Sequence, residues 1–143
     1  MNQIQTKSSN TCVIPTSRYR DGQAAIDWLC RAFGFELQLV VPDKSGAIAH
    51  AQLTYGNGMI MLGSATNNEF HELVKSPLES GGIGSQSVFI MIEDVDEHHR
   101  TAIAAGAEVV IKLKDEDYGG RAYSCLDLED HVWNFGSYNP WKQ

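Results

Sequence analysis

Apolar residues recur along this chain with two different periods. From Asp21 to Gly34 they are spaced as on one face of a helix. Asp21 can accept hydrogen bonds from the free N–H groups of the first turn, and Gly34 can take the left-handed conformation that ends a helix. A second, more polar helix is predicted from Asp94 to Gly106. The residues expected to face the core are Ala25, Ile26, Leu29, Ala32 and Phe33 in the first helix, and Val95, Ala102 and Ile103 in the second, with His99 left open between the core and solvent.

Segments of β-type composition surround both helices. In the first half, strands are expected near the start of 12–20 and over 35–41, 47–55 and 59–62; in the second half, from Ser85, after Gly106, and over 121–126 and 131–135. In the strand 47–55, the residues expected on one side are Ile48, His50, Gln52 and Thr54.

The two halves therefore share one order of parts, namely a strand, a helix and three more strands. The Asp that opens each helix is followed, 42 positions later, by the Gly that closes the last strand, from Asp21 to Gly63 (63 − 21) and from Asp94 to Gly136 (136 − 94). This agreement predicts a twofold repeat of one module.

Size and composition limit what the modules can be. With 143 residues, 43% of them hydrophobic, the chain suffices for one compact domain, so the two modules must share a core. The net charge of −7 argues against a nucleic-acid partner, and no apolar run approaches the roughly 20 residues needed to span a membrane. Cys12, Cys30 and Cys125 are an odd number without CxxC spacing, which favours reduced thiols in a cytoplasmic protein.

The domain organisation follows from these patterns. Residues 1–11 lack the apolar core of a signal peptide and are interpreted as a flexible leader, and residues 12–143 as a single domain. Within it, module 1 covers about 12–64 and module 2 about 85–143. The polar linker 65–84 is longer than most connections, which indicates either a crossover between half-sheets or a lid over a site.

Three segments carry a resemblance to a known family. DGQAAIDWLCRAFGFE, EDVDEHHRTAIAAGAE and DYGGRAYSCLDLEDHVWNFG resemble the vicinal oxygen chelate superfamily, which includes glyoxalase I, bleomycin-resistance proteins and extradiol dioxygenases. Within it, they are most similar to the glyoxalase-like branch often labelled after the phosphonate operon. The resemblance implies an α+β fold in which two βαβββ modules form an open-sided, mixed eight-stranded sheet around a cleft, with the helices on the outer face, often in a homodimer.

The resemblance also implies where a metal would bind. Catalytic members of the superfamily hold a divalent metal with His or Glu from the first and fourth strands of each module. Those positions fall here at Ile14, Met61, Ser87 and Asn134, none of which is a normal carboxylate or imidazole ligand. No metal cofactor is therefore expected. A further departure is Asp130, where the family turn usually has Gly; Asp tolerates the left-handed conformation better than most residues.

The same positions predict the lining of the cleft. Period-two alternation places a set of apolar and polar side chains on their side of the strands. The candidate ligand-binding residues are Thr16, Arg18, His50, Met59, Met61, Ser87, Phe89, Met91, Arg121 and Asn134. Arg121, with Tyr118 and Tyr123, is expected either to close over an anionic or planar ligand or to anchor the glycine-rich loop.

Histidines are the remaining candidates for chemistry. His50 is expected either in the cleft, as a general base or a group that orients a substrate, or as a strand residue without a function. His98 and His99 are expected to be solvated, His131 to bond locally, and His71 to reach the cleft only as part of a lid.

Two functional hypotheses remain. The first is a metal-free protein that binds a hydrophobic or aromatic small molecule, in the manner of bleomycin-resistance relatives. The alternative is a lyase, isomerase or dioxygenase that uses acid–base chemistry through His50, or a displaced divalent metal held by His50 and a carboxylate such as Glu36. Because an open-sided sheet leaves strand edges unprotected, a homodimer is expected in either case.

Overall fold

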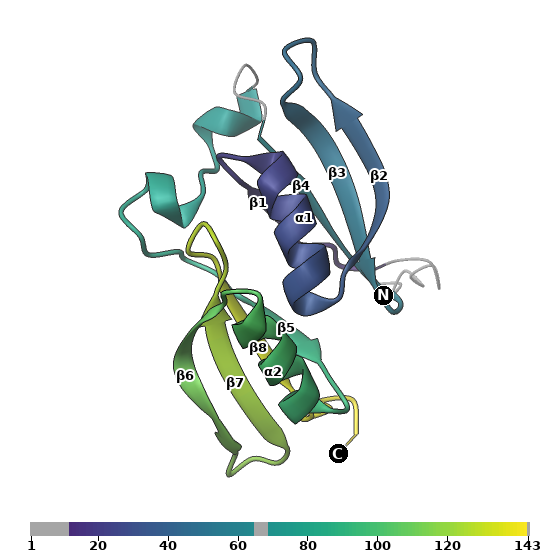
Figure 1. Ribbon diagram of the computed structural model, residues 1–143, viewed down its shortest axis with the longest axis vertical. Coiled ribbons are helices and arrows are strands. Elements are labelled where there is room, and N and C mark those ends of the chain that lie inside the picture. Colours follow the sequence, from purple (N-terminus) through teal and green to yellow (C-terminus); the bar gives the residue numbers. More distant parts are fainter. Residues whose placement is uncertain (1–11, 65–68, 143) are drawn as a thin grey trace, which may run out of the picture.

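A computed structural model describes residues 12–64 and 69–142 (Figure 1). The predicted leader 1–11 and the first four residues of the predicted linker lie outside these ranges. Module 1 consists of β1 (Thr16–Arg18), α1 (Gly22–Phe33), β2 (Glu36–Pro42), β3 (Ile48–Tyr55) and β4 (Gly58–Gly63). Module 2 consists of β5 (Val88–Met91), α2 (Val95–Ala104), β6 (Glu108–Asp115), β7 (Arg121–Leu126) and β8 (Val132–Gly136). Two short 3-10 helices, η1 (Glu69–Glu72) and η2 (Pro77–Glu79), lie in the linker.

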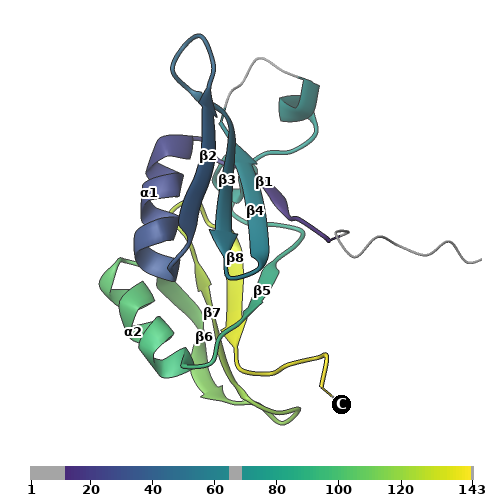
Figure 2. The ribbon, with the colours of Figure 1, turned by 90° about the vertical axis from the view of Figure 1, so that its right-hand side faces the viewer.

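The predicted repeat is confirmed, because both modules have the same sheet topology. The strand orders are β1-β4-β3-β2 and β5-β8-β7-β6, and in each sheet the first pair is parallel and the other two are antiparallel. The eight strands therefore form two four-stranded mixed sheets. Figure 2 shows α1 and α2 on one side of the molecule and both sheets on the other, so each sheet has one face covered by a helix and one open face.

The helix ends are set by the residues that the sequence indicated. The Asp21 carboxylate accepts a hydrogen bond from Ala24 N at 3.0 Å, and Asp94 accepts one from Glu97 N at the same distance. Gly34 follows α1 with φ of 89°. Each cap satisfies a backbone group that the helix itself leaves without a partner.

The core lies between the helices and the covered faces of the two sheets. All five apolar residues predicted for α1 are buried, together with Trp28, and Trp133 and Phe135 of β8 pack against Phe33. Two predictions were wrong at the edge of this core. Ile103 of α2 is 47% exposed, and Ile48 is buried on the side opposite His50. The second difference arises because the register of β2 and β3 shifts between Val41 and Pro42.

A buried carboxylate in the turn between β7 and β8 joins the two modules. Asp127 accepts the hydroxyl of Tyr19 at 2.5 Å and the indole N–H of Trp133 at 2.9 Å, and its other oxygen accepts the N–H groups of Glu129 and His131. Burial and the charge of Asp127 both raise the pKa of Tyr19 well above its ordinary value. The turn is thereby fixed to the segment that connects β1 with α1.

The neighbouring residues of the turn strengthen this junction. The Glu129 carboxylate accepts the backbone N–H groups of Arg20 and Asp21 at 2.5 and 2.9 Å. The backbone N–H of His131 bonds locally to Asp127, whereas its Nε2 donates to the carbonyl of Arg18, 113 residues away, a contact that the sequence did not predict. Asp130 has φ of 67° and holds the left-handed conformation expected of it.

A second junction connects the helices. His98 of α2 lies between the modules, with Nε2 3.0 Å from the carbonyl of Phe33 and Nδ1 2.7 Å from the hydroxyl of Tyr123. Since a carbonyl only accepts, Nε2 carries the proton and Nδ1 accepts from the tyrosine. Burial lowers the pKa of His98. The expectation that His98 is solvated was wrong, because the helix packs its histidine face toward Phe33.

Candidate functional site

The open face of the module 1 sheet carries a polar row between apolar side chains. His50 Nε2 lies 2.7 Å from Gln52 Oε1, and Gln52 Nε2 donates to Gln38 Oε1 at 2.6 Å. Because β4 pairs with β3, Met59 and Met61 lie on the same face, beside Thr54 and Gln52. The row fixes the direction in which each amide and imidazole points, which makes this face a surface with defined donors and acceptors.

Module 2 repeats this arrangement on its own open face. Asn134 is held in the centre, since its Oδ1 accepts the Ser124 hydroxyl at 2.6 Å and its Nδ2 lies 2.9 Å from Ser87 Oγ. Phe89 pairs with Asn134 across β5 and β8, and Phe89 and Met91 are 41% and 45% exposed. An aromatic ring thus lies beside an amide of fixed orientation, with the thioether of Met91 two residues further along β5.

The predicted site residues divide into two groups in this structure. Those on open faces are Thr16, His50, Met59 and Met61 in module 1 and Ser87, Phe89, Met91 and Asn134 in module 2. The two sheets share no paired strands within the described residues, so the two sets lie on separate sheets.

Arg121 and its predicted tyrosine partners lie in different surroundings. Arg121 forms ion pairs with Asp96 at 3.1 Å and Asp115 at 3.3 Å, which is the anchoring role that the sequence left open. Tyr123 is 1% exposed and belongs to the core, so it cannot close over a ligand, whereas Tyr118 is exposed and packs edge-on against Tyr138.

Neither the metal-equivalent positions nor the displaced alternative fits a divalent cation. Met61 offers only a thioether, and Ser87 and Asn134 bond to each other. Glu36 pairs with Thr54, four residues along β3 from His50, which separates the two backbones by about 13 Å at 3.3 to 3.4 Å per residue. In the part of the chain that the structure describes, no three His, Cys, Asp or Glu side chains are grouped to hold a metal ion.

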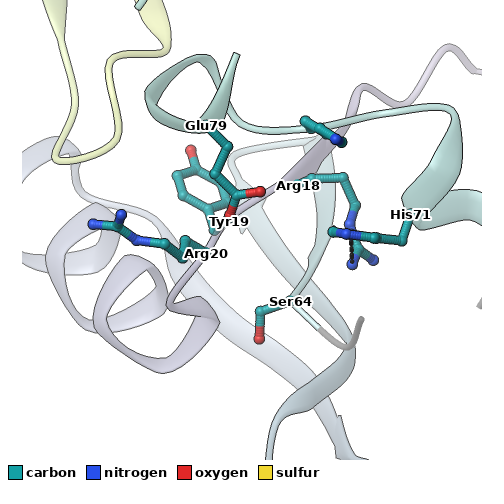
Figure 3. A pocket seen from close by; sticks show the side chains of 7 residues that line it. Arg18, Tyr19, Arg20, Ser64, His71 and Glu79 are labelled. Carbon is teal, nitrogen blue, oxygen red and sulfur yellow. Dashed lines mark hydrogen bonds between the residues drawn. The ribbon is translucent and has the colours of Figure 1, made fainter. Parts of the chain in front are cut away.

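Arg18 lies at the end of the module 1 face, where it pairs with Gly63 two positions along β1 from Thr16. Its side chain is 5% exposed, and Nη2 lies 3.3 Å from His71 Nδ1 in η1 (Figure 3). Burial lowers the pKa of Arg18, and the charge of Glu79 partly offsets that effect. A cavity of about 160 Å³ opens here, between the end of β1 and the linker. It is lined by Arg18, Tyr19, Arg20, Ser64, His71, Lys75 and Glu79.

Sequence reasoning missed this cavity. His71, Lys75 and Glu79 all belong to the linker, which has no periodic pattern that assigns its side chains to a face. The one available signal was the concentration of charged residues and His71 in a segment that the sequence suggested as a lid.

Comparisons with known proteins agree on the architecture. The profile described as the Glyoxalase/Bleomycin resistance protein/Dioxygenase superfamily matches residues 12–135. The crystal structure of TioX from Micromonospora sp. ML1 is similar with a TM-score of 0.72 and 36% identity, over 91% of this chain and 100% of that one. The fosfomycin resistance protein FosX from Listeria monocytogenes has a TM-score of 0.64 and 15% identity, over 94% and 98% of the two chains, and shows the fold alone.

In sequence, an uncharacterized protein from Mycobacterium bovis is 29% identical over 116 residues, which cover 81% of this chain and 76% of that protein. These matches confirm the resemblance and the α+β fold of two βαβββ modules. Among the described residues, no helix is long and apolar enough to cross a membrane.

Proposed function

We propose that this chain, which belongs to the Glyoxalase/Bleomycin resistance protein/Dioxygenase superfamily, binds a small hydrophobic or aromatic molecule against the open faces of its sheets without a metal. The observation that carries the proposal is the module 2 face, where exposed Phe89 lies beside Asn134 and exposed Met91 follows two residues further along β5. Small-molecule sites combine apolar and aromatic walls with a few polar groups of fixed orientation.

The polar groups on both faces support this composition of the site. Asn134 is held by Ser87, Val88 and Ser124, and His50 by Gln52. Both Nδ2 hydrogens of Asn134 are used in these bonds, so Asn134 presents the remaining lone pair of Oδ1 and His50 presents Nδ1 as acceptors of fixed direction. A planar ligand would stack on Phe89 while a donor on its edge bonds to Oδ1 of Asn134.

A second copy of the chain would complete the site. Strand β2, at one edge of its sheet, exposes Leu37, Leu39, Val40 and Val41 by 38% to 48%, and β6, at the edge of the other, exposes Val110 and Ile111 by 49% and 50%. Edge strands with this much apolar surface are usually covered by another chain. We infer a homodimer in which the open faces of two copies enclose the ligand.

The absence of a metal from the proposed site follows from its chemistry. Thioether, hydroxyl and amide groups that already bond to one another are poor ligands for zinc, nickel, iron or manganese ions. The enzymatic alternative through His50 would have to use Nδ1 as the base, because Nε2 donates its proton to Gln52 on the same strand.

A thermal-shift screen of metabolites and aromatic antibiotics tests the proposal. A ligand that binds only the folded state at a hundredfold excess over Kd stabilises it by about 2.7 kcal/mol, which is a clear rise in melting temperature. We expect hits for the wild type that are lost in Asn134→Leu and Phe89→Ala. Hits that shift all three proteins equally would place the binding elsewhere, and a compound consumed over time would replace binding with catalysis.

Sedimentation at micromolar concentration tests the dimer separately. We expect a species of twice the chain mass, and a species of only one chain mass would remove the claim that two copies enclose the ligand.

A further inference from the structure

We propose that the cavity between β1 and the linker is an anion site that takes a phosphate or sulfate group. This inference goes beyond the proposed function, because it concerns a different part of the molecule. Its volume of about 160 Å³ corresponds to roughly five water molecules at about 30 Å³ each, which suits one small oxyanion with some hydration.

The charge of the lining carries the proposal. Three lining residues are cations, Arg18, Arg20 and Lys75, and one is a carboxylate, Glu79, so the lining has a net charge of +2 (3 − 1) in a chain with a net charge of −7. Cations concentrated in a concave site of an acidic protein attract anions to that site in preference to the rest of the surface.

Arg18 is the strongest of these groups, because its guanidinium stays charged although the side chain is 95% buried (5% exposed). Removing a charge from water is costly unless an opposite charge offsets the cost. Glu79 supplies part of the offset, since its charge raises the pKa of Arg18. A phosphate or sulfate group in the cavity would supply more, through the forked N–H geometry that suits oxyanions.

The neutral residues of the lining add donors. A guanidinium only donates, so His71 Nδ1 must accept from Arg18 and the His71 proton lies on Nε2. The Ser64 hydroxyl accepts a hydrogen bond from Ile48 N at 3.2 Å, which leaves its own hydrogen to be donated. Figure 3 shows Arg18 and His71 side by side, with Arg20 extending away from them at the other end of the cavity.

Lys75 completes the site from the linker. Neither Lys75 nor Arg20 forms an ion pair within 4 Å with any described residue, so their charges are not already neutralised by a carboxylate at that distance. The site therefore combines a buried guanidinium from β1 with an exposed ammonium from a separate segment. An anion bound between them would tie the linker to module 1.

Isothermal titration calorimetry of the full chain with inorganic phosphate, inorganic sulfate and phenyl phosphate, at constant ionic strength in chloride, tests the proposal. We expect saturable binding to the wild type that weakens about tenfold or more in Lys75→Met and in Arg18→Gln, which corresponds to the loss of one charge-assisted hydrogen bond. Lys75 is exposed, so its variant keeps the test valid if Arg18→Gln does not fold.

The matched control is Lys44→Met, which removes an exposed lysine from the turn before β3 and should bind as the wild type does. Equal affinity for inorganic phosphate and phenyl phosphate would identify a free anion, and tighter binding of phenyl phosphate would identify a ligand that carries the group. The proposal is overturned if none of the three probes binds saturably, or if binding is the same in Lys75→Met as in Lys44→Met. Phe89→Ala should leave anion binding unchanged, which separates this result from that of the aromatic screen.

Discussion

The hydrogen bond between Tyr19 and Asp127 connects the two modules, and Tyr19→Phe removes it while keeping the shape of the ring. The bond is 2.5 Å long, and the two side chains are 2% and 5% exposed. A hydrogen bond to a charged group contributes about 1.5 to 3 kcal/mol to stability. Because Asp127 keeps the donors Trp133, Glu129 and His131, we expect a loss near the middle of that range, about 2 kcal/mol.

A second variant at the same junction should cost more. Each oxygen of Asp127 accepts hydrogen bonds from two donors. In Asp127→Asn, an NH2 group replaces one of these oxygens, so two of the four donors would lie against another donor and lose their hydrogen bonds. We expect the free energy of unfolding to fall by about 3 to 5 kcal/mol, as when one partner of a buried charged pair is removed. At roughly 4 °C per kcal/mol for a chain of this size, the two variants should lower the melting temperature by about 8 °C and by more than 10 °C.

Urea unfolding followed by tryptophan fluorescence measures both losses. Tyr118→Phe is the matched control, because that hydroxyl lies on a side chain that is 60% exposed and its removal should change stability by less than about 0.5 kcal/mol. If Tyr19→Phe lowers the urea midpoint no more than Tyr118→Phe does, the junction does not hold the modules together in the way described.

Three further predictions follow from single residues. Burial lowers the pKa of His98, so below about pH 6.5 the unfolded chain binds a proton that the folded chain does not. The free energy of unfolding should therefore be largest above about pH 6.5 and fall as the pH decreases below it. Urea unfolding at each pH should show a smaller decrease in His98→Gln. Burial, with the charge of Asp127, raises the pKa of Cys125 to about 12, so mass spectrometry should find this thiol modified by iodoacetamide only after unfolding, and rapid modification of the folded chain would contradict its burial. Gly120→Ala should lower the melting temperature more than Gly46→Ala. Both glycines have positive φ, but only a Cβ on residue 120 would meet another atom closely, the backbone N of Tyr138 at 2.6 Å. Equal losses of melting temperature would refute that close approach.

The periodic parts of the fold could be predicted from the sequence. Asp21, Asp94 and Gly34 act locally, through backbone groups within four residues, so their roles can be recognised without knowledge of the fold. Period-two alternation likewise assigned Phe89 and Asn134 to one face of their sheet.

Contacts between distant segments could not be predicted in the same way. Alternation shows which face a side chain occupies but not what lies across from it. His98 meets Phe33 only because α2 packs against α1, and Arg18 turns toward His71 only because the linker returns to β1. The division of the strands into two sheets has the same origin, since nothing local in β1 or β5 specifies whether their edges pair.

The most direct test of the proposed function is the affinity of a compound from the thermal-shift screen for the wild type, Phe89→Ala and Ile103→Ala. Phe89 and Ile103 are 41% and 47% exposed, but the first lies on the open face of β5 and the second on α2, on the other side of the module. Loss of an aromatic anchor costs about 2 kcal/mol or more, so calorimetry should give a Kd at least about twentyfold higher for Phe89→Ala and an unchanged Kd for Ile103→Ala. Equal affinities for all three proteins would contradict binding against the open face.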